Sequence, residues 1–275
     1  MRFNYKTLLG IGLSTLLLSS VQAKEIPLDN PLPANFVPSA EIGLELARTT
    51  CGTCHGLQGD GVIRDKEGNP RLNKAGEPMS MGPTFPRLAG QHPEYILQQL
   101  RSLQISHMDP ERAKKEGIYR VEVQMMPYVS MPMMGGKMLD SEMAAHIAAW
   151  FSSQKPVLAD AAKTPSNEFE TRIDYLYRGG DVNRNIPACS SCHSPSGMGN
   201  GPAKYPMIAG QYAQYTEKQL FAFKNSRAEK AVRSNDPERM MRDIAERLTD
   251  EEIKGLAKYI ETLQIKRPTI RQANN

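Results

Sequence analysis

After its first two dozen residues, the sequence lacks any apolar run long enough to cross a bilayer, and it has little net charge. Removing residues 1–23 takes away Arg2 and Lys6, which lowers the formal net charge from +4 to +2. So small an excess does not indicate nucleic acid or an anionic membrane as a partner. The hydrophobic content of 40% and the charged content of 23% are typical of a globular protein in water.

Residues 1–23 have the pattern of a secretory signal peptide. Arg2 and Lys6 precede a short apolar stretch from Leu8 to Leu18, and the segment ends in Val-Gln-Ala at Ala23. The apolar stretch is too short for a comfortable membrane span, although an uncleaved anchor is the alternative. No cysteine follows it, which argues against a lipoprotein. We therefore expect export to the periplasm, with cleavage after about Ala23.

Cysteine is scarce, and all four cysteines lie in two copies of the pattern C-x-x-C-H. The residues are Cys51, Cys54 and His55 in the first copy, and Cys189, Cys192 and His193 in the second. Disulfides or a redox-active C-x-x-C do not explain the histidine that follows both copies. Zinc is a weaker alternative, because neither half offers a second C-x-x-C or an H-x-x-x-H. In c-type haem attachment, both thiols bond to the haem and the histidine ligates iron. We predict two covalent haem c groups.

The chain repeats itself beyond these motifs. "FPRLAGQHPEYILQQL" begins at Phe85 and "YPMIAGQYAQYTEKQL" begins at Tyr205, and apolar residues in both recur at helical spacing. The expected fold is all-α, with two haem-binding halves joined by a linker. The expected bounds are 37–155 for domain 1, 156–166 for the linker and 167–268 for domain 2, with a polar loop insertion at about 61–82 in domain 1.

Two pairs of repeated residues have expected supporting roles. A backbone carbonyl near Pro86 or Pro206 is expected to accept the Nδ1–H of the neighbouring haem-ligating histidine. Tyr95 and Tyr215 occupy equivalent positions, where they reach the haem propionates or the boundary between the halves, or pack as ordinary amphipathic side chains.

The second half contains no histidine except His193, so an internal sixth ligand to its iron must be a softer group. The methionine candidates are Met198, Met207, Met240 and Met241. Met240 and Met241 come just before the last predicted helix, where the chain returns across the open haem face. A methionine partner to histidine raises the reduction potential.

The signal peptide, the two C-x-x-C-H units, "FPRLAGQ", "YPMIAGQ" and the segment from "KQLFAFKNSRAEK" to "GLAKYI" together resemble the dihaem cytochrome c4 family. The resemblance implies two tandem class I cytochrome c domains. It also implies an axial methionine seven residues before the leucine that opens the last helix of each half. Counting back from Leu248 selects Met241, but counting back from Leu139 gives Pro132. We therefore predict Met131, which precedes a proline, as the first-half ligand.

The alternatives in the first half are Met133, Met134, His107 and His92. Met125 and Met126 are expected to pack, and His146 is expected to be a packed or surface histidine.

The resemblance implies a periplasmic electron carrier rather than an enzyme. A quinol-oxidising complex or a dehydrogenase would be its donor, and a terminal oxidase or reductase its acceptor. The alternative is a dihaem enzyme or enzyme subunit, of the peroxidase or thiosulfate dehydrogenase kind. The dihaem thiosulfate dehydrogenases use an additional cysteine as axial ligand, which this chain lacks. A third hypothesis is Cu(I) handling by the methionine-rich stretch 125–138, because clustered thioethers suit that ion.

Overall fold

The computed structural model describes residues 26–132, 136–158, 165–228 and 230–265. The predicted signal peptide and the candidate ligands Met133 and Met134 lie outside the described residues. In these ranges the chain forms helices and loops, with isolated β-bridges in place of strands, so the predicted all-α class is confirmed. No helix within the same ranges is both long and apolar enough to span a bilayer.

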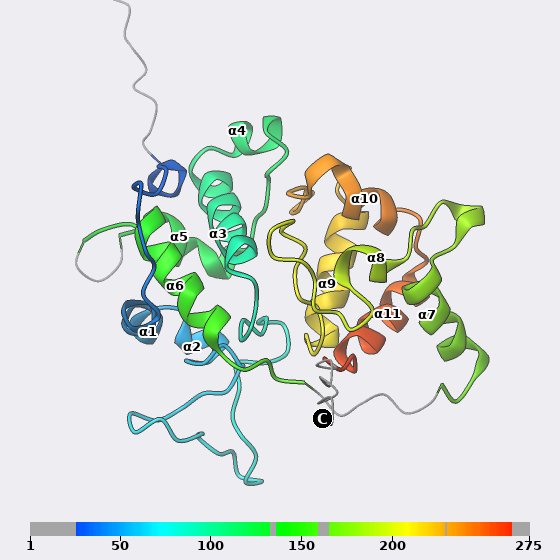
Figure 1. The fold of residues 1–275 in the computed structure, drawn as a ribbon, viewed down its shortest axis with the longest axis horizontal. Coiled ribbons are helices and arrows are strands. Elements are labelled where there is room, and N and C mark those ends of the chain that lie inside the picture. The colour runs from blue at the N-terminus through cyan, green and yellow to red at the C-terminus, as the bar shows by residue number, and fades with distance from the viewer. Residues whose placement is uncertain (1–25, 133–135, 159–164, 229, 266–275) are drawn as a thin grey trace, which may run out of the picture.

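The first half is built around α3 and α6 (Figure 1). Its helices are η1 (Pro27–Asp29), α1 (Ala40–Thr49), α2 (Gly52–His55), α3 (Pro93–Met108), α4 (Pro110–Lys115), η2 (Val123–Met125), α5 (Met126–Ser130) and α6 (Ser141–Ser153). Ser39, Asp109 and Asp140 accept backbone N–H groups at the starts of α1, α4 and α6, which fixes where those helices begin. Apolar residues of α3 and α6 face one another in a single buried cluster.

The second half repeats this plan with a different set of helices. They are α7 (Glu168–Gly179), η3 (Val182–Arg184), α8 (Cys189–His193), α9 (Ala213–Lys224), η4 (Pro237–Arg239), α10 (Met240–Ala245) and α11 (Asp250–Glu261). The predicted capping box at the start of α11 is present, because Thr249 and Glu252 bond each other's backbone N–H groups. Ile253, Leu256 and Ile260 of α11 form the core with α7 and α9.

In each half, two long helices cross closely at a glycine, because a residue with a side chain would collide with the facing helix there. A Cβ atom at Gly43 of α1 would collide with the backbone carbonyl of His146 in α6. In the second half, a Cβ at Gly255 of α11 would lie 2.8 Å from the side chain of Ile173 in α7. The close crossing brings the ends of each half together around the segment that carries the C-x-x-C-H motif.

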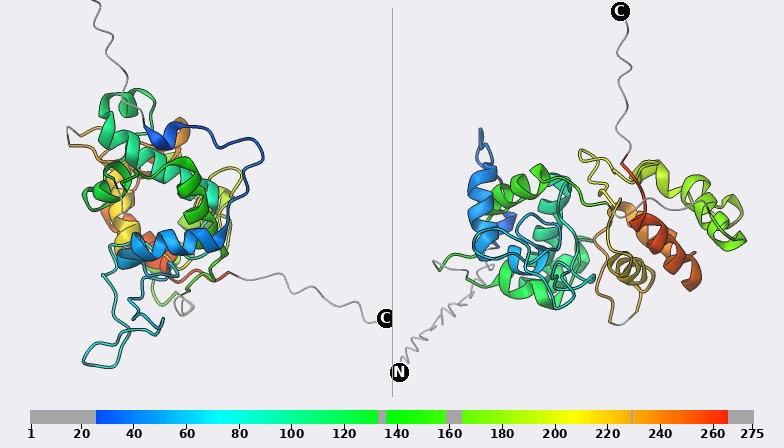
Figure 2. Two further views of the ribbon diagram at one scale, coloured as in Figure 1. Left: turned by 90° about the vertical axis from the view of Figure 1, so that its left-hand side faces the viewer. Right: turned by 90° about the horizontal axis from the view of Figure 1, so that it is seen from below.

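The two halves lie side by side (Figure 2). A short antiparallel β-bridge joins them at Arg120 and Arg233. It consists of hydrogen bonds from the backbone N–H of Val121 to Val232 (2.8 Å) and from that of Ser234 to Tyr119 (2.7 Å). The halves are therefore joined by paired backbone as well as by side chains.

The predicted insertion forms a projection of paired, extended backbone that leaves the first half (Figures 1 and 2). Its backbone hydrogen bonds link Ile63, Arg71 and Met79, so three segments lie next to one another. At its base, Arg64 bonds the buried carboxylate of Asp60 at 2.5 Å. The projection is anchored to the first half at this ion pair.

Candidate haem-binding sites

Both C-x-x-C-H motifs fold into one helical turn. The turn of α2 ends at His55 and that of α8 at His193, and each is followed by a residue with positive φ: Gly56 at 76° and Ser194 at 66°. A left-handed residue ends the turn, so the chain reverses direction directly after the histidine. In both halves the two cysteines and the histidine therefore reach the same cavity.

Each motif histidine is buried and held by a backbone carbonyl. His55 Nδ1 bonds the carbonyl oxygen of Pro86 at 2.8 Å, and His193 Nδ1 bonds that of Pro206 at 3.0 Å. The predicted bonds from the "FP" and "YP" elements are thus present, and Pro86 and Pro206 provide the oxygens. Burial lowers the pKa of both histidines. A neutral ring with Nδ1 bonded in this way presents Nε2 as a metal ligand.

One cavity of about 520 Å³ extends from one motif to the other, and its walls are mostly apolar. Cys51 and Cys54 line one end, and Cys189 and Cys192 line the other. None of the four forms a disulfide in the described structure. Burial raises the pKa of Cys51, and it raises that of Cys189 to about 11. Thiols in an apolar cavity beside a buried histidine are the donor set that covalent haem requires.

The cavity also contains two buried guanidinium groups, one from each half. Arg120 donates hydrogen bonds to Gln99 and to the hydroxyl of Tyr215, the latter at 3.0 Å. Arg233 donates in the same way to Gln219 and, at 3.2 Å, to Tyr95. Tyr95 and Tyr215 therefore lie at the boundary between the halves, which was one of their expected positions.

The Nε atom of Arg120 is buried and has no hydrogen-bond partner in the described structure. A haem carries two propionate carboxylates, and buried cations with free donors suit such anions. Arg120 therefore fits the group that the cysteines and histidines indicate. Sequence reasoning missed both arginines, because "YRVEV" and "AVRSN" share only the arginine and lie outside the visible repeat.

In the second half, the structure brings Met240 and Met241 to the cavity. Met241 packs against the hydrophobic core, whereas the sulfur of Met240 lies 3.9 Å from the hydroxyl of Tyr205. Met198 is 43% exposed. Met207 lines the cavity directly after Pro206, on the side of the motif histidine.

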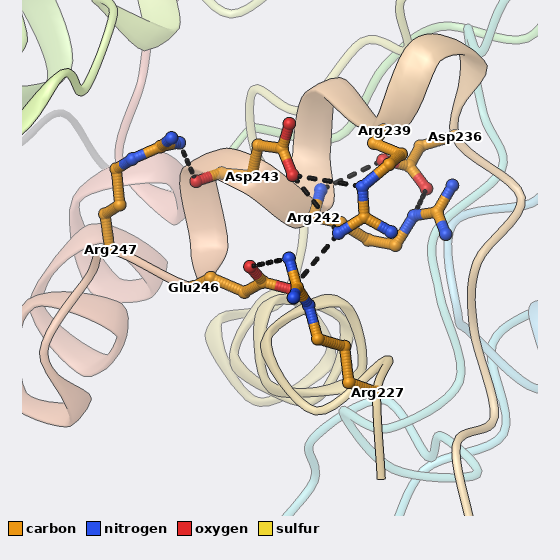
Figure 3. Close-up of polar contacts among 7 residues, drawn as sticks. All are labelled: Arg227, Asp236, Arg239, Arg242, Asp243, Glu246 and Arg247. Atoms are coloured by element: carbon orange, nitrogen blue, oxygen red, sulfur yellow. Dashed lines mark hydrogen bonds and ion pairs between the residues drawn. The ribbon is translucent and has the colours of Figure 1, made fainter.

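Ion pairs fix the helix that carries Met241 (Figure 3). The buried Asp236 accepts the backbone N–H of Arg242 at 2.9 Å and its side-chain Nε at 2.6 Å. Arg239 bonds Asp243 and Glu246 on the same segment. These contacts fix α10, whose Met240, Met241 and Ile244 line the cavity.

In the first half, the structure brings Met125 to the cavity and leaves Met131 outside it. Met131 is 46% exposed and is not among the cavity-lining residues. Met125 lines the cavity and packs against the first hydrophobic core. In the described structure Met125, and not the predicted Met131, is therefore the methionine at the cavity.

The register of the two short helices makes Met125 the counterpart of Met241. Met125, directly before α5, lies four residues before Val129, the fully buried residue of that helix; Met241 lies four residues before Ala245, the fully buried residue of α10. In both helices a second cavity-lining residue follows three positions later, Tyr128 or Ile244. Residues four and three apart lie on one face of a helix, so both short helices present the same face to the cavity.

The extra residues of the first half lie after the short helix. Gln104 bonds the carbonyl of Leu139, and Lys224, at the same place in the repeat, bonds that of Leu248 at 2.8 Å. Leu139 and Leu248 therefore correspond, but the chain from Met125 is seven residues longer. Counting back seven residues from Leu139 therefore does not arrive at Met125, whereas counting back seven from Leu248 arrives at Met241.

The remaining histidines are outside the haem cavity. His92 Nε2 bonds the carbonyl of Met198 across the boundary at 2.7 Å, and His146 Nδ1 accepts the N–H of Ser39 at 2.8 Å. His107 is half-buried near the backbone of Glu122. None of the three lines the cavity, and His146 has the packing role expected from sequence. The described residues also contain no group of three or more His, Cys, Asp or Glu side chains placed to hold a bare metal ion.

Comparisons with known proteins agree with this arrangement. The family model for cytochrome c matches the chain twice, at residues 40–155 and 185–264. Cytochrome c4 of Azotobacter vinelandii is 35% identical over 214 residues, which are 78% of this chain and 84% of the relative. The crystal structure of reduced recombinant cytochrome c4 from Pseudomonas stutzeri aligns with a TM-score of 0.62 at 31% identity, covering 83% of this chain and all of that one.

A further relative has a name that states a partner. The thiosulfate dehydrogenase electron acceptor of Stutzerimonas stutzeri (strain A1501) is 31% identical over 217 residues, which are 79% of this chain and 80% of the relative. Its identity is lower than the 35% of the cytochrome c4 from Azotobacter vinelandii, over a similar length of this chain.

Two cytochrome c matches, each containing one C-x-x-C-H motif with a buried histidine, mean that the chain carries two covalently bound haem c groups. The resemblance noted from the sequence motifs is confirmed by these matches and by the fold. The chain belongs to the cytochrome c4 family of dihaem electron-transfer proteins.

Proposed function

We propose that this protein is a periplasmic electron carrier in which each haem iron has one histidine and one methionine ligand. His55 and Met125 are the ligands in the first half, and His193 and Met241 are those in the second. The observation that carries the proposal is the matching placement beside the shared cavity of Met125, directly before α5, and of Met241, in α10. We assign the first-half ligand to Met125 and not to Met131, the residue predicted from the sequence, because the Met131 side chain is exposed.

The covalent attachment points are Cys51 and Cys54 in domain 1 and Cys189 and Cys192 in domain 2. The two domains extend over 37–155 and 167–268, with 156–166 as the linker and 61–82 as an insertion. Residues 1–23 are a signal peptide that is cleaved after about Ala23 on export.

When bound, the haem supplies the one-electron chemistry, and the chain sets the conditions for it. Pro86 and Pro206 hold the proton on Nδ1 of the ligating histidines, so Nε2 donates to iron. The apolar cavity walls would keep water from the haem, and methionine ligation would favour the reduced state. Arg120 and Arg233 would bind the propionate carboxylates at the boundary between the two sites.

A site closed on both sides transfers electrons and leaves no position for a substrate, so we assign no enzymatic activity. The partners are redox proteins: a quinol-oxidising complex or a dehydrogenase as donor, and a terminal oxidase or reductase as acceptor. Contacts with such partners are small and short-lived. The relative named as a thiosulfate dehydrogenase electron acceptor supports one second candidate, in which a sulfur-oxidising dehydrogenase is the donor.

Carbon monoxide tests whether the sites are closed. It binds to reduced haem only where the sixth position is open or its ligand is easily displaced. The reduced wild-type protein is expected to keep an unchanged visible spectrum under carbon monoxide at neutral pH. Rapid binding at either haem would contradict the closed His/Met arrangement and would favour a dihaem enzyme instead.

A further inference from the structure

Two glutamines from the repeated Ala-Gly-Gln element bind across the boundary between the halves. Gln211 Oε1 accepts the backbone N–H of Arg87 at 3.0 Å, and its Nε2 donates to the carbonyl of Arg87 at 3.0 Å. Gln91 makes the reciprocal pair with Met207, at 2.9 Å for both bonds. Each side chain therefore binds one residue of the opposite half as a neighbouring strand would.

The residue bound in each case directly follows the proline that holds the motif histidine. Pro86 and Arg87 share one peptide group, whose carbonyl accepts His55 Nδ1–H at 2.8 Å and whose N–H donates to Gln211. In the Pro206–Met207 peptide group, the carbonyl accepts His193 Nδ1–H at 3.0 Å and the N–H donates to Gln91 Oε1 at 2.9 Å. A chain of hydrogen bonds thus connects each motif histidine to a glutamine of the other half.

The orientation of both amides follows from their neighbours. Gln91 Oε1 also accepts the N–H of His92 at 3.0 Å, and Gln211 Oε1 accepts that of Tyr212 at 3.1 Å. Two N–H donors meet at each Oε1, while a carbonyl faces each Nε2. A flipped amide would therefore place its NH2 group against N–H donors and its oxygen against a carbonyl oxygen. Gln91 is 5% exposed, so water competes little for these bonds.

We propose that Gln91 and Gln211 are positioning residues, each of which lowers the reduction potential of the haem in the opposite half. An N–H that donates to Oε1 polarises its peptide group, and the carbonyl of that group becomes a stronger acceptor. A stronger acceptor draws the Nδ1 proton and makes the imidazole a better donor, which favours the oxidised iron. The inference rests on the proposed function, because it takes His55 and His193 as iron ligands.

The arrangement has a consequence for the whole molecule. Gln211 belongs to the second half but acts on the first haem, and Gln91 does the reverse. A change in the contact between the halves therefore changes both potentials, without any movement inside either haem site. Contacts at the boundary between the halves therefore help to set both reduction potentials.

The test is a redox titration of Gln211→Met and Gln91→Met in the full-length dihaem protein. Methionine keeps the length of the side chain but cannot accept from or donate to the peptide group. Nuclear magnetic resonance of the haem methyl groups, assigned through contacts with side chains of their own half, gives each potential separately. Gln211→Met should raise the potential of the first haem more than that of the second, and Gln91→Met should do the opposite.

A second pair of variants distinguishes polarisation from structural damage. In Gln211→Glu and Gln91→Glu, a carboxylate oxygen still accepts the peptide N–H and adds negative charge. Each should lower the potential of the opposite haem, whereas loosening of the boundary would shift it in the same direction as methionine does. If a methionine variant fails to incorporate haem, the glutamate variants carry the test.

His92→Phe is the matched control. It removes a hydrogen bond across the same boundary that ends on Met198 and not on a peptide group bonded to a motif histidine. It should leave the difference between the two potentials unchanged. Three results in the glutamine variants would overturn the proposal. They are equal shifts of the two reduction potentials, a shift of the potential only in the half that carries the substitution, and no shift of either potential. Carbon monoxide binding by the wild-type protein would instead contradict the ligand assignment, so the two failures are distinct.

Discussion

Arg120 of the first half donates a hydrogen bond of 3.0 Å to the hydroxyl of Tyr215 in the second half. The reverse contact, from Arg233 to Tyr95, measures 3.2 Å. Both arginines are buried in the cavity between the two C-x-x-C-H motifs. Burial alone would lower the pKa of Arg120, but Tyr215, Tyr95 and Glu122 outweigh it and raise that pKa. The guanidinium is therefore charged beside both sites.

Replacing Arg120 by methionine should lower both haem potentials. A buried positive charge favours the reduced iron, which carries one positive charge fewer than the oxidised iron, and little water is present to screen it. The variant also leaves the hydroxyl of Tyr215 without its Arg120 donor and removes one of the two bonds to Gln99, which keeps the bond from Asn235; this should cost about 1–3 kcal/mol of unfolding free energy. Spectroelectrochemical titration measures the potentials. Arg120→Lys should retain most of the wild-type value, and a rise in potential on removing the charge would contradict the account.

The ion pair of Arg184 and Glu252 predicts part of the pH dependence of stability. Glu252 is 2% exposed and accepts two bonds from Arg184, at 2.8 and 2.9 Å. Burial raises the pKa of Glu252, but the bonds from Arg184 and from the backbone of Thr249 outweigh it and keep that pKa below its ordinary value. The stabilisation is complete above the unfolded-state pKa of about 4.3 and is lost as the pH falls through the folded-state value.

Arg184→Gln should therefore lower the free energy of unfolding by about 1–3 kcal/mol at pH 7, because Arg184 is itself partly exposed. The difference from wild type should shrink as the pH falls below about 4. Guanidinium chloride unfolding at several pH values measures it. Arg178→Gln is the control, since its 2.8 Å pair with Asp174 is more exposed and should be worth less than about 1 kcal/mol. A difference between wild type and Arg184→Gln that grows in acid would contradict the assignment.

Removing the projection at 61–82 should leave both haems unchanged. The N–H of Ile63 already bonds the carbonyl of Met79 at 2.8 Å, so Asn-Gly in place of residues 64–78 can close a short hairpin there. The loss of the Arg64 bond to Asp60 should cost about 1–2 kcal/mol of stability. Visible spectra and the response to carbon monoxide should match wild type. A new open haem in the variant would show that the projection covers the first site.

The sequence was sufficient to predict what short-range chemistry dictates. Each C-x-x-C-H motif contains its own cysteines and histidine, and helical turns as short as α2 and α8 form locally. The helical halves followed from apolar spacing, and the capping box of α11 from Thr249 and Glu252. The matching "FP" and "YP" elements indicated where the carbonyls that bond the histidines lie. The structure then showed that these carbonyls belong to Pro86 and Pro206.

Long-range register could not be predicted in the same way. Met125 lies far from His55 in the sequence, and the loop after α5 is longer than its counterpart after α10. A fixed count from Leu139 therefore does not arrive at Met125, which the structure places at the cavity four residues before the buried Val129. Arg120 and Arg233 were missed because their role depends on contacts between halves, which no local pattern encodes.

The weak red absorption band of methionine-ligated ferric haem tests the central claim most directly. The band should be present for two haems in the oxidised wild-type protein. Met125→Ala and Met241→Ala should each remove about half of it, because each variant leaves one His/Met iron, while Met131→Ala should retain all of it. Full retention in Met125→Ala, or loss of half the band in Met131→Ala, would contradict the assignment of Met125 as the first-half ligand.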